Sequence, residues 1–194
     1  MDTIILGSSS PRRRNILKQM KLPFISIPVD IKEHVPEEEA EKYTVKMATE
    51  KVKALLRIQP DNDVKWLLGA DTVIEYNNRI IGKPASREEA KEFLYLFSGN
   101  KHKVVTGIAL FNPKNRNIST EYAVTEVFFS TLNEGEIEWY LDTEEWRGAA
   151  GGYRIQERGA YFVEKINGCY SNVVGLPINT FYGILSKNDY PFKD

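Results

Sequence analysis

The start of the chain joins a short apolar segment, residues 4–6, to a loop of small hydroxyl-bearing residues, 7–10, and then to Pro11 and three consecutive arginines. Apolar residues recur at helical spacing beyond this point, so the pattern predicts a buried strand, a tight loop and a helix. Proline suits a first helical turn because its φ is preset and it has no N–H to leave unpaired. Ser9 or Ser10 is expected to cap the helix. The chain is thereby restricted to folds in which a strand delivers a loop to a helix start.

The arginines at this helix start indicate an anion site. Unpaired backbone N–H groups and the helix macrodipole favour anions there, so Arg12, Arg13 and Arg14 oppose the dipole unless an anion binds. Guanidinium groups match phosphate oxygens in bidentate fashion. The alternative interpretation is a capped helix with a solvated basic first turn. We expect a phosphate-binding loop.

Composition limits the class of protein. A chain of 194 residues suffices for one core, or one core with a smaller lobe, and we expect a single domain over residues 1–194. The 26 Lys and Arg against 27 Asp and Glu give a net charge of -1, and a dedicated nucleic-acid binder is usually more basic.

Cysteine and histidine usage and the absence of long apolar runs indicate the compartment. Cys169 is the single cysteine, so it forms no internal disulfide, and with only His34 and His102 a Cys- or His-rich zinc centre is excluded. No apolar stretch approaches the length of about 20 residues that spans a membrane, and no secretory signal pattern opens the chain. We expect a cytoplasmic protein.

Hydrophobic periodicity predicts alternating strands and helices, which is typical of an α/β fold. A strand, a helix and a strand at the start suggest a βαβ unit, and a break is expected at Asp71, where a buried strand meets polar residues. Glycines remove all periodicity from residues 148–159, and residues 171–177 are expected to form a loop. The predicted strands cover residues 4–6, 24–29, 66–76, 79–82, 104–111, 121–130 and 160–163, and the predicted helices begin at 11 and cover 36–58, 86–97, 134–143 and 178–185.

Three further segments share the character of the first loop: small residues, a break in periodicity and isolated charges that no helix face requires. They are Gly69–Thr72, Gly82–Pro84 and Ala150–Gln156. Together with Ser8–Arg13, they resemble the Maf family of nucleoside triphosphate pyrophosphatases. Two more segments, His102–Gly107 and Val173–Pro177, extend the resemblance over nearly the whole chain.

The resemblance implies an activity and a fold. The activity is hydrolysis of a nucleoside triphosphate between its α- and β-phosphates, to the monophosphate and pyrophosphate, with Mg or Mn as divalent cation. The family is thought to cleanse nucleotide pools and has been linked to septum formation. The implied fold is mixed α/β, with an elongated central sheet flanked by helices and two lobes with a cleft, similar to inosine triphosphate pyrophosphatases. Members are commonly homodimers.

Triphosphate hydrolysis requires neutralised phosphate charge, a metal clamp and a base that deprotonates water. Asp71 is the candidate for the base or a metal ligand, and the resemblance assigns the family's proton acceptor to it; a turn cap is the alternative. Glu33 matches an acidic residue of the family that shares the metal; the alternative interpretation is a solvated carboxylate in a loop. Two carboxylates and phosphate oxygens suffice for magnesium.

The resemblance also implies the substrate-binding residues. Lys83, between a glycine and a proline, is long enough to contact a phosphate; the alternative interpretation is an exposed lysine in a turn. Lys51 matches the family's helix lysine; the alternative interpretation is that it belongs to a charged, solvated helix face. Gln156 offers the donor and the acceptor that an imide edge of uracil or thymine requires. The full set is Ser8, Arg12, Arg13, Lys51, Thr72, Lys83 and Gln156.

Base preference follows from three of these positions. Those that match Arg12, Thr72 and Gln156 are associated with substrate choice in the family. The glutamine resembles the subgroup that acts on dTTP and UTP.

The sequence departs from the family pattern at two positions. Ala149 stands where many members have lysine, and Glu157 where glycine commonly follows the glutamine. The first change removes a positively charged side chain that could contact the phosphates. The second places a carboxylate where glycine is common. Arg147, Arg154 or Arg158 are candidates to compensate.

These departures motivate an alternative function, a nucleotide-binding regulator of cell division or septum formation with weak or vestigial catalysis. A single-stranded nucleic-acid binder that uses Arg12–Arg14 is disfavoured by the overall charge. The preferred interpretation is the enzyme.

Overall fold

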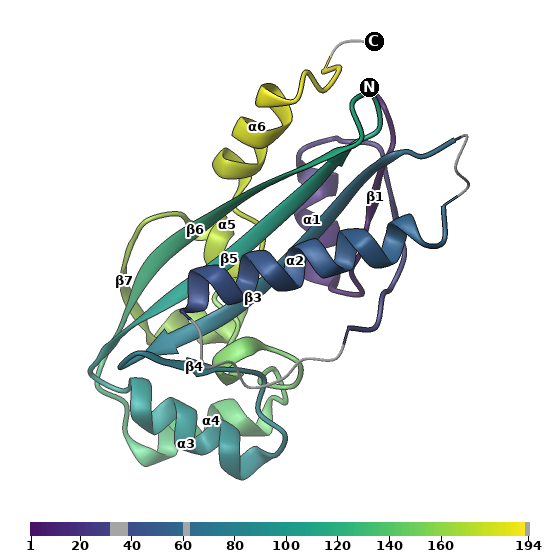
Figure 1. Cartoon of the computed structure of the whole chain (residues 1–194). Helices are drawn as coiled ribbons and strands as arrows, with labels where there is room; N and C mark the ends of the chain where they lie inside the picture. The colour runs from purple at the N-terminus through teal and green to yellow at the C-terminus, as the bar shows by residue number, and fades with distance from the viewer. Residues whose placement is uncertain (32–38, 60–62, 193–194) are drawn as a thin grey trace.

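The computed structural model describes residues 1–31, 39–59 and 63–192, which form a mixed α/β fold (Figure 1). The elements are β1 (Ile4–Leu6), α1 (Pro11–Gln19), β2 (Phe24–Ser26), α2 (Ala40–Leu56), β3 (Trp66–Tyr76), β4 (Arg79–Ile81), α3 (Arg87–Phe97), β5 (Lys101–Asn112), β6 (Asn117–Phe129), α4 (Glu134–Asp142), the 3-10 helices η1 (Ala150–Gly152) and η2 (Arg158–Phe162), β7 (Val163–Asn167), α5 (Tyr170–Val174) and α6 (Ile178–Lys187).

A seven-stranded sheet in the order β2-β1-β3-β5-β6-β7 organises the fold, with β4 paired to β3. β1 is parallel to β2 and β3, and the other pairs are antiparallel. The predicted βαβ start and the mixed α/β class are therefore confirmed.

Helices cover both faces of the sheet. α2 lies across one face, whereas α1, α5 and α6 lie on the other, and α3 and α4 pack together at one end (Figure 1). One hydrophobic cluster gathers around β1, α1 and α6, and another around α3, α4 and η1. No helix of the described residues is long and apolar enough to cross a membrane.

Three local predictions are wrong. The strand that contains Asp71 has no break: β3 continues through it, because Asp71 keeps its place opposite Gly107 of β5. Residues 160–163 mostly belong to η2, since burial there does not alternate: Ala160 and Tyr161 are both exposed, between buried Gly159 and Phe162. The strand follows as β7. The expected loop after Ser171 contains the short helix α5, which buries Asn172.

The helix caps agree more closely with the sequence. Of the two candidates, Ser10 caps α1, and its Oγ accepts from the backbone N–H of Arg13 at 3.5 Å. Ser86 caps α3, and Glu89 donates its own backbone N–H to the Ser86 Oγ at 3.2 Å. α2 begins at Ala40, and the predicted start at residues 36–38 lies outside the described residues.

Glycines in β3 and β5 let α2 approach the sheet closely. A Cβ atom at Gly69 would lie 2.0 Å from the carbonyl oxygen of Ala48, and one at Gly107 would lie 2.3 Å from the carbonyl carbon of Thr44. Backbone therefore contacts backbone where a side chain normally intervenes. The approach brings Lys51 of α2 within reach of β3.

Gly107→Ala is expected to lower the free energy of unfolding by about 1–3 kcal/mol, because the added methyl group must push α2 away from the sheet. Urea unfolding followed by circular dichroism measures this change. Gly183→Ala in α6 is the control, since a Cβ there meets no atom within 4 Å, and helix propensity predicts a gain of roughly 0.5–1 kcal/mol. Equal stability of the two variants would contradict the close packing of α2.

Candidate functional site

A gap in the sheet forms the candidate site. β1 pairs with β3 at residues 66–68, and β4 pairs with the same edge at residues 74–76. Between them, residues 69–73 have no strand partner on this edge in the described part of the chain. A cavity of about 730 Å³ opens at this gap. Ligand sites of α/β sheets favour such places, where neighbouring strands diverge.

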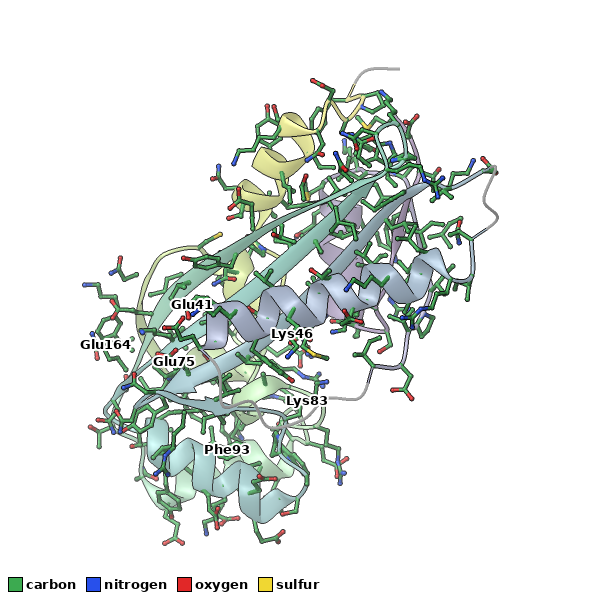
Figure 2. The ribbon with its side chains drawn as sticks, viewed as in Figure 1. Glu41, Lys46, Glu75, Lys83, Phe93 and Glu164 are labelled. Carbon is green, nitrogen blue, oxygen red and sulfur yellow. The ribbon has the colours of Figure 1, made fainter. Side chains whose placement is uncertain are left out.

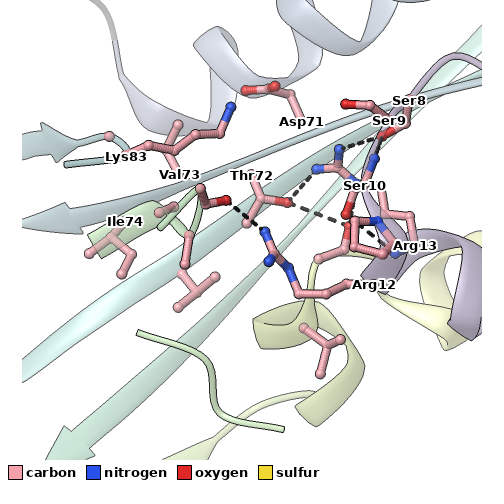
Figure 3. Close-up of a pocket in the computed structure, with 18 of the residues that line it drawn as sticks. Ser8, Ser9, Ser10, Arg12, Arg13, Asp71, Thr72, Val73, Ile74 and Lys83 are labelled. Carbon is pink, nitrogen blue, oxygen red and sulfur yellow. Dashed lines mark hydrogen bonds between the residues drawn. The ribbon is translucent and has the colours of Figure 1, made fainter. Parts of the chain in front are cut away.

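The cavity gathers the residues that the sequence singled out. Successive side chains of a strand point to opposite faces, so Asp71 lies on the α2 side of β3 and Thr72 on the α1 side (Figure 3). Because the edge of β3 is open, both reach the same cavity. Glu33 lies outside the described residues. The other predicted site residues, Ser8, Arg12, Arg13, Lys51, Asp71, Thr72, Lys83 and Gln156, all line the cavity.

Arg13 fastens the serine-rich loop to the rest of the site. Its guanidinium is buried and donates from Nε to the carbonyl oxygen of Gly175 at 2.8 Å, from Nη2 to Thr72 Oγ1 at 2.9 Å and from Nη1 to Ser8 Oγ at 3.3 Å (Figure 3). Ser8 Oγ also accepts from the backbone N–H of Ser10 at 3.1 Å. Arg13 thus holds the loop, β3 and the end of α5 in one arrangement.

Arg12 crosses the cavity in the other direction. Its Nη2 donates to the carbonyl oxygen of Gly148 at 3.0 Å, so it joins the first loop to the glycine-rich wall (Figure 3). Burial lowers the pKa of Arg12 from its ordinary value, and the positive charge of Arg154 lowers it further. A guanidinium so placed gains from a bound anion.

Lys51 and Asp71 form a buried ion pair. Lys51 Nζ lies 2.5 Å from Asp71 Oδ1 and donates to the carbonyl oxygen of Ala70 at 3.2 Å. The two side chains are only 11% and 9% exposed. Asp71 Oδ2 makes no hydrogen bond to any other described residue. The alternative interpretation of Lys51, a charged helix face, is therefore wrong, because close packing of α2 turns the side chain inward.

Lys83 approaches from the connection between β4 and α3. It lies between α2 and the α3–α4 pair, and its amine points to the side of β3 that holds Asp71 (Figures 2 and 3). The preceding residue is fixed, since the Gly82 carbonyl oxygen accepts from the Gly151 N–H at 2.8 Å. Gly151 has a φ of 67°, which favours glycine.

The glycine-rich wall carries Gln156 at its rim. Gln156 Nε2 donates to Glu157 Oε1 at 3.5 Å, and Glu157 also pairs with Arg154 at 3.1 Å. Ala149 is buried in the wall. Of the arginines considered as compensation, Arg147 and Arg154 line the cavity. Arg158 pairs with Glu145 and does not line it.

The donor set can be compared with the demands of a divalent cation. In the described residues no three His, Cys, Asp or Glu side chains gather as metal ligands, and the cavity offers the carboxylates of Asp71 and Asp30. Magnesium is usually held by one or two carboxylates, with substrate phosphates and water as the remaining ligands. A cavity with few carboxylates and many phosphate-matching cations fits this mode.

Sequence reasoning missed several contributors. Thr72 Oγ1 lies 2.9 Å from Thr106 Oγ1 and 3.5 Å from the Gly175 carbonyl oxygen, so both groups support Thr72. The segments 102–107 and 173–177 carried a signal, because both belong to the pattern that extended the family resemblance. Tyr43 lines the cavity without any sequence signal.

His102 lies in the core and does not line the cavity. Its Nε2 and Tyr153 Oη share a hydrogen bond of 2.8 Å, and Phe97 packs against its ring at a centroid distance of 4.3 Å. No described residue bonds to Nδ1. Burial lowers the pKa of His102 to about 3 and raises the pKa of Tyr153 above its ordinary value.

The fold and the cavity are those of an α/β protein with a cationic cleft, suited to a phosphorylated ligand. Residues 3–188 match the Maf-like protein family, and the chain belongs to this family. A protein of Pelotomaculum thermopropionicum named dTTP/UTP pyrophosphatase is 41% identical over 192 residues, which cover 98% of each chain.

Relatives of the same name show similar agreement. The Ruminiclostridium cellulolyticum protein is 40% identical over 194 residues, with 96% of each chain covered. The Clostridium botulinum protein is 38% identical over 187 residues, which cover 95% of this chain and 96% of the relative.

The buried imidazole predicts a pH dependence of stability. The pKa of His102 falls from 6.5 in the unfolded chain to about 3 in the fold, so the unfolded state binds an extra proton between these values. His102 therefore makes the free energy of unfolding decrease as pH falls through this window, by about 1.4 kcal/mol per pH unit, with no such loss above the unfolded pKa.

Urea unfolding of wild type and His102→Gln at a series of pH values isolates this effect from the carboxylates. The wild type is expected to lose more stability than the variant between pH 6.5 and 4. Parallel pH profiles would show that His102 is protonated in the folded protein.

Proposed function

We propose that this protein hydrolyses nucleoside triphosphates, preferably dTTP and UTP, to the monophosphate and pyrophosphate. Membership of the Maf-like family and the printed names of the relatives support the activity. The observation that carries the proposal to these residues is the open edge of β3, where Asp71 faces a cavity walled by Arg12 and Lys83. A carboxylate among cations suits water attack on a bound polyphosphate.

Each group has a chemical task. The serine-rich loop with Ser8, Arg12 and Arg13 binds phosphate, and Lys83 neutralises phosphate charge from the other side. Thr72 and the amide of Gln156 contact the nucleoside part, where Gln156 offers the acceptor and the donor that an imide edge requires.

Asp71 is the proposed general base. Its Oδ1 accepts from Lys51, which compensates the negative charge within the fold and fixes the carboxylate. Oδ2 takes the proton of the attacking water as the water oxygen bonds to phosphorus. The phosphoanhydride bond then breaks, and pyrophosphate carries away the bond electrons.

The proposal includes a divalent cation, Mg or Mn, held by Asp71 together with Glu33. When bound, the cation would neutralise charge on the phosphate oxygens. The proposal further includes one domain over residues 1–194, assembled as a homodimer in the cytoplasm. Light scattering of the purified protein tests the homodimer.

A pyrophosphate-release assay over all ribo- and deoxyribonucleoside triphosphates, with Mg or Mn and with chelator, tests the activity. We expect dTTP and UTP to be turned over preferentially, chelation to abolish release, and Gln156→Leu to reduce the preference. Binding of these nucleotides without any release would instead support the nucleotide-binding regulator. Salt-sensitive binding of oligonucleotides that nucleotides do not displace would support the nucleic-acid binder.

Asp71→Asn is expected to lower kcat by roughly 10²–10⁴-fold, because the amide cannot accept the proton. Steady-state kinetics measure the loss, and thermal unfolding checks that the variant is folded. Glu75→Gln is the matched control, since this carboxylate lies on the same strand, pairs with Lys103 at 2.8 Å and does not line the cavity. Wild-type kcat in folded Asp71→Asn would rule out Asp71 as the base.

A further inference from the structure

Arg154 is held at the rim of the cavity by groups that a ligand can replace. Its backbone N–H donates to Tyr140 Oη at 3.1 Å, which fixes the residue between η1 and η2. Its side chain pairs through Nη1 with Glu157, at 3.1 Å to Oε2 and 3.4 Å to Oε1, and Nη2 donates to the Arg147 carbonyl oxygen at 2.8 Å. The backbone anchor is independent of the guanidinium.

The held conformation leaves a donor unsatisfied. Arg154 Nε is buried and has no hydrogen-bond partner among the described residues. Buried N–H groups are nearly always paired in folded proteins, so an orphaned one marks strain or an absent ligand. The guanidinium is thus incompletely satisfied in the ion pair with Glu157, and a shift toward an acceptor in the cavity would remove the deficit.

The surrounding charges favour an anion as that acceptor. Arg12 and Arg154 lie near enough for Arg154 to lower the pKa of Arg12, while Glu157 opposes this effect. Both arginines line the cavity, whereas Glu157 does not. An anion between two guanidinium groups relieves their repulsion. Carboxylate and phosphate present the same fork of oxygens to arginine, so one replaces the other readily.

We propose that Arg154 is a phosphate-binding residue that Glu157 holds in the ligand-free protein, and that an incoming polyphosphate displaces the Glu157 carboxylate. Glu157 is then a positioning residue: it keeps Arg154 at the rim and weakens polyphosphate binding by competing for it. The inference rests on the proposed function only for the ligand class, a polyphosphate. It assigns a role to the two charges that this chain carries beside Gln156.

A double-mutant cycle with inorganic tripolyphosphate tests the competition. Calorimetry measures the Kd for wild type, Glu157→Gln, Arg154→Gln and the double variant. We expect Glu157→Gln to bind about threefold more tightly, since a partly exposed ion pair contributes little, and Arg154→Gln to bind about tenfold more weakly. In the Arg154→Gln background the gain from Glu157→Gln should vanish. Thermal unfolding confirms that each variant is folded.

Glu145→Gln is the matched control, because Glu145 pairs with Arg158 at 3.0 Å and neither residue lines the cavity. Its Kd is expected to equal that of wild type. A gain from Glu157→Gln that persists without Arg154 would overturn the proposal, since it would show a charge effect through space. Loss of uridine affinity instead of tripolyphosphate affinity in Arg154→Gln would overturn it in favour of base binding.

The cycle is separable from the proposed function because it measures binding and needs no turnover. An inactive protein with the expected cycle would retain the polyphosphate site and lose the proposed hydrolysis. If the protein is active but all four Kd values are equal, the proposed hydrolysis stands and the proposed role of Arg154 is ruled out. Kinetics with UTP add a second readout: Arg154→Gln is expected to raise KM more than it lowers kcat.

Discussion

The buried contact between Lys51 and Asp71 is the interaction on which the site depends. Removing two charges from water is unfavourable unless each compensates the other at close range. The close range exists only because Gly69 and Gly107 let α2 lie directly on β3 and β5. The two glycines and the ion pair therefore depend on one another. Together they set the depth of α2, and they present a charged carboxylate at the centre of a sheet.

The open edge of β3 makes Asp71 and Thr72 accessible to a ligand in one cavity. In a sheet paired on both edges, Asp71 and Thr72 would belong to opposite faces and would not share a ligand. The divergence of β1 from β3 removes the barrier between the faces, and Arg13 closes the arrangement by bonding to Thr72 and Ser8. The same divergence places the start of α1 at the cavity. Backbone topology, rather than any single residue, thus brings the charges together.

Local chemistry in the sequence was sufficient to predict the strand, the loop and the serine-capped helix at the start of the chain, and the α/β class. These features depend on neighbouring residues or on a pattern along the whole chain. Only the family resemblance assigned Lys51 to the site. Local chemistry did not predict its inward turn, since that depends on glycines of two distant strands. The helix α5 was missed for a similar reason: its Asn172 is held by Val104 and Thr125 from the sheet. The placement of Glu33 stays a prediction.

On the proposal above, the departures at Ala149 and Glu157 affect the stability of the site as well as its affinity for phosphate. A lysine in the cavity wall would be a permanent cation, which binds phosphate and repels Arg12 at all times. An arginine paired with a carboxylate repels Arg12 less than an unpaired lysine would, because Glu157 partly opposes the effect of Arg154 on Arg12. On this proposal, the positive charge of Arg154 becomes available to the cavity only when an anion displaces Glu157, and Arg12 destabilises the ligand-free fold less than it would beside a fixed lysine. Compared with a lysine, the Arg154–Glu157 ion pair is expected to lower the affinity for phosphate and to raise the stability of the ligand-free fold, because the carboxylate compensates the positive charge.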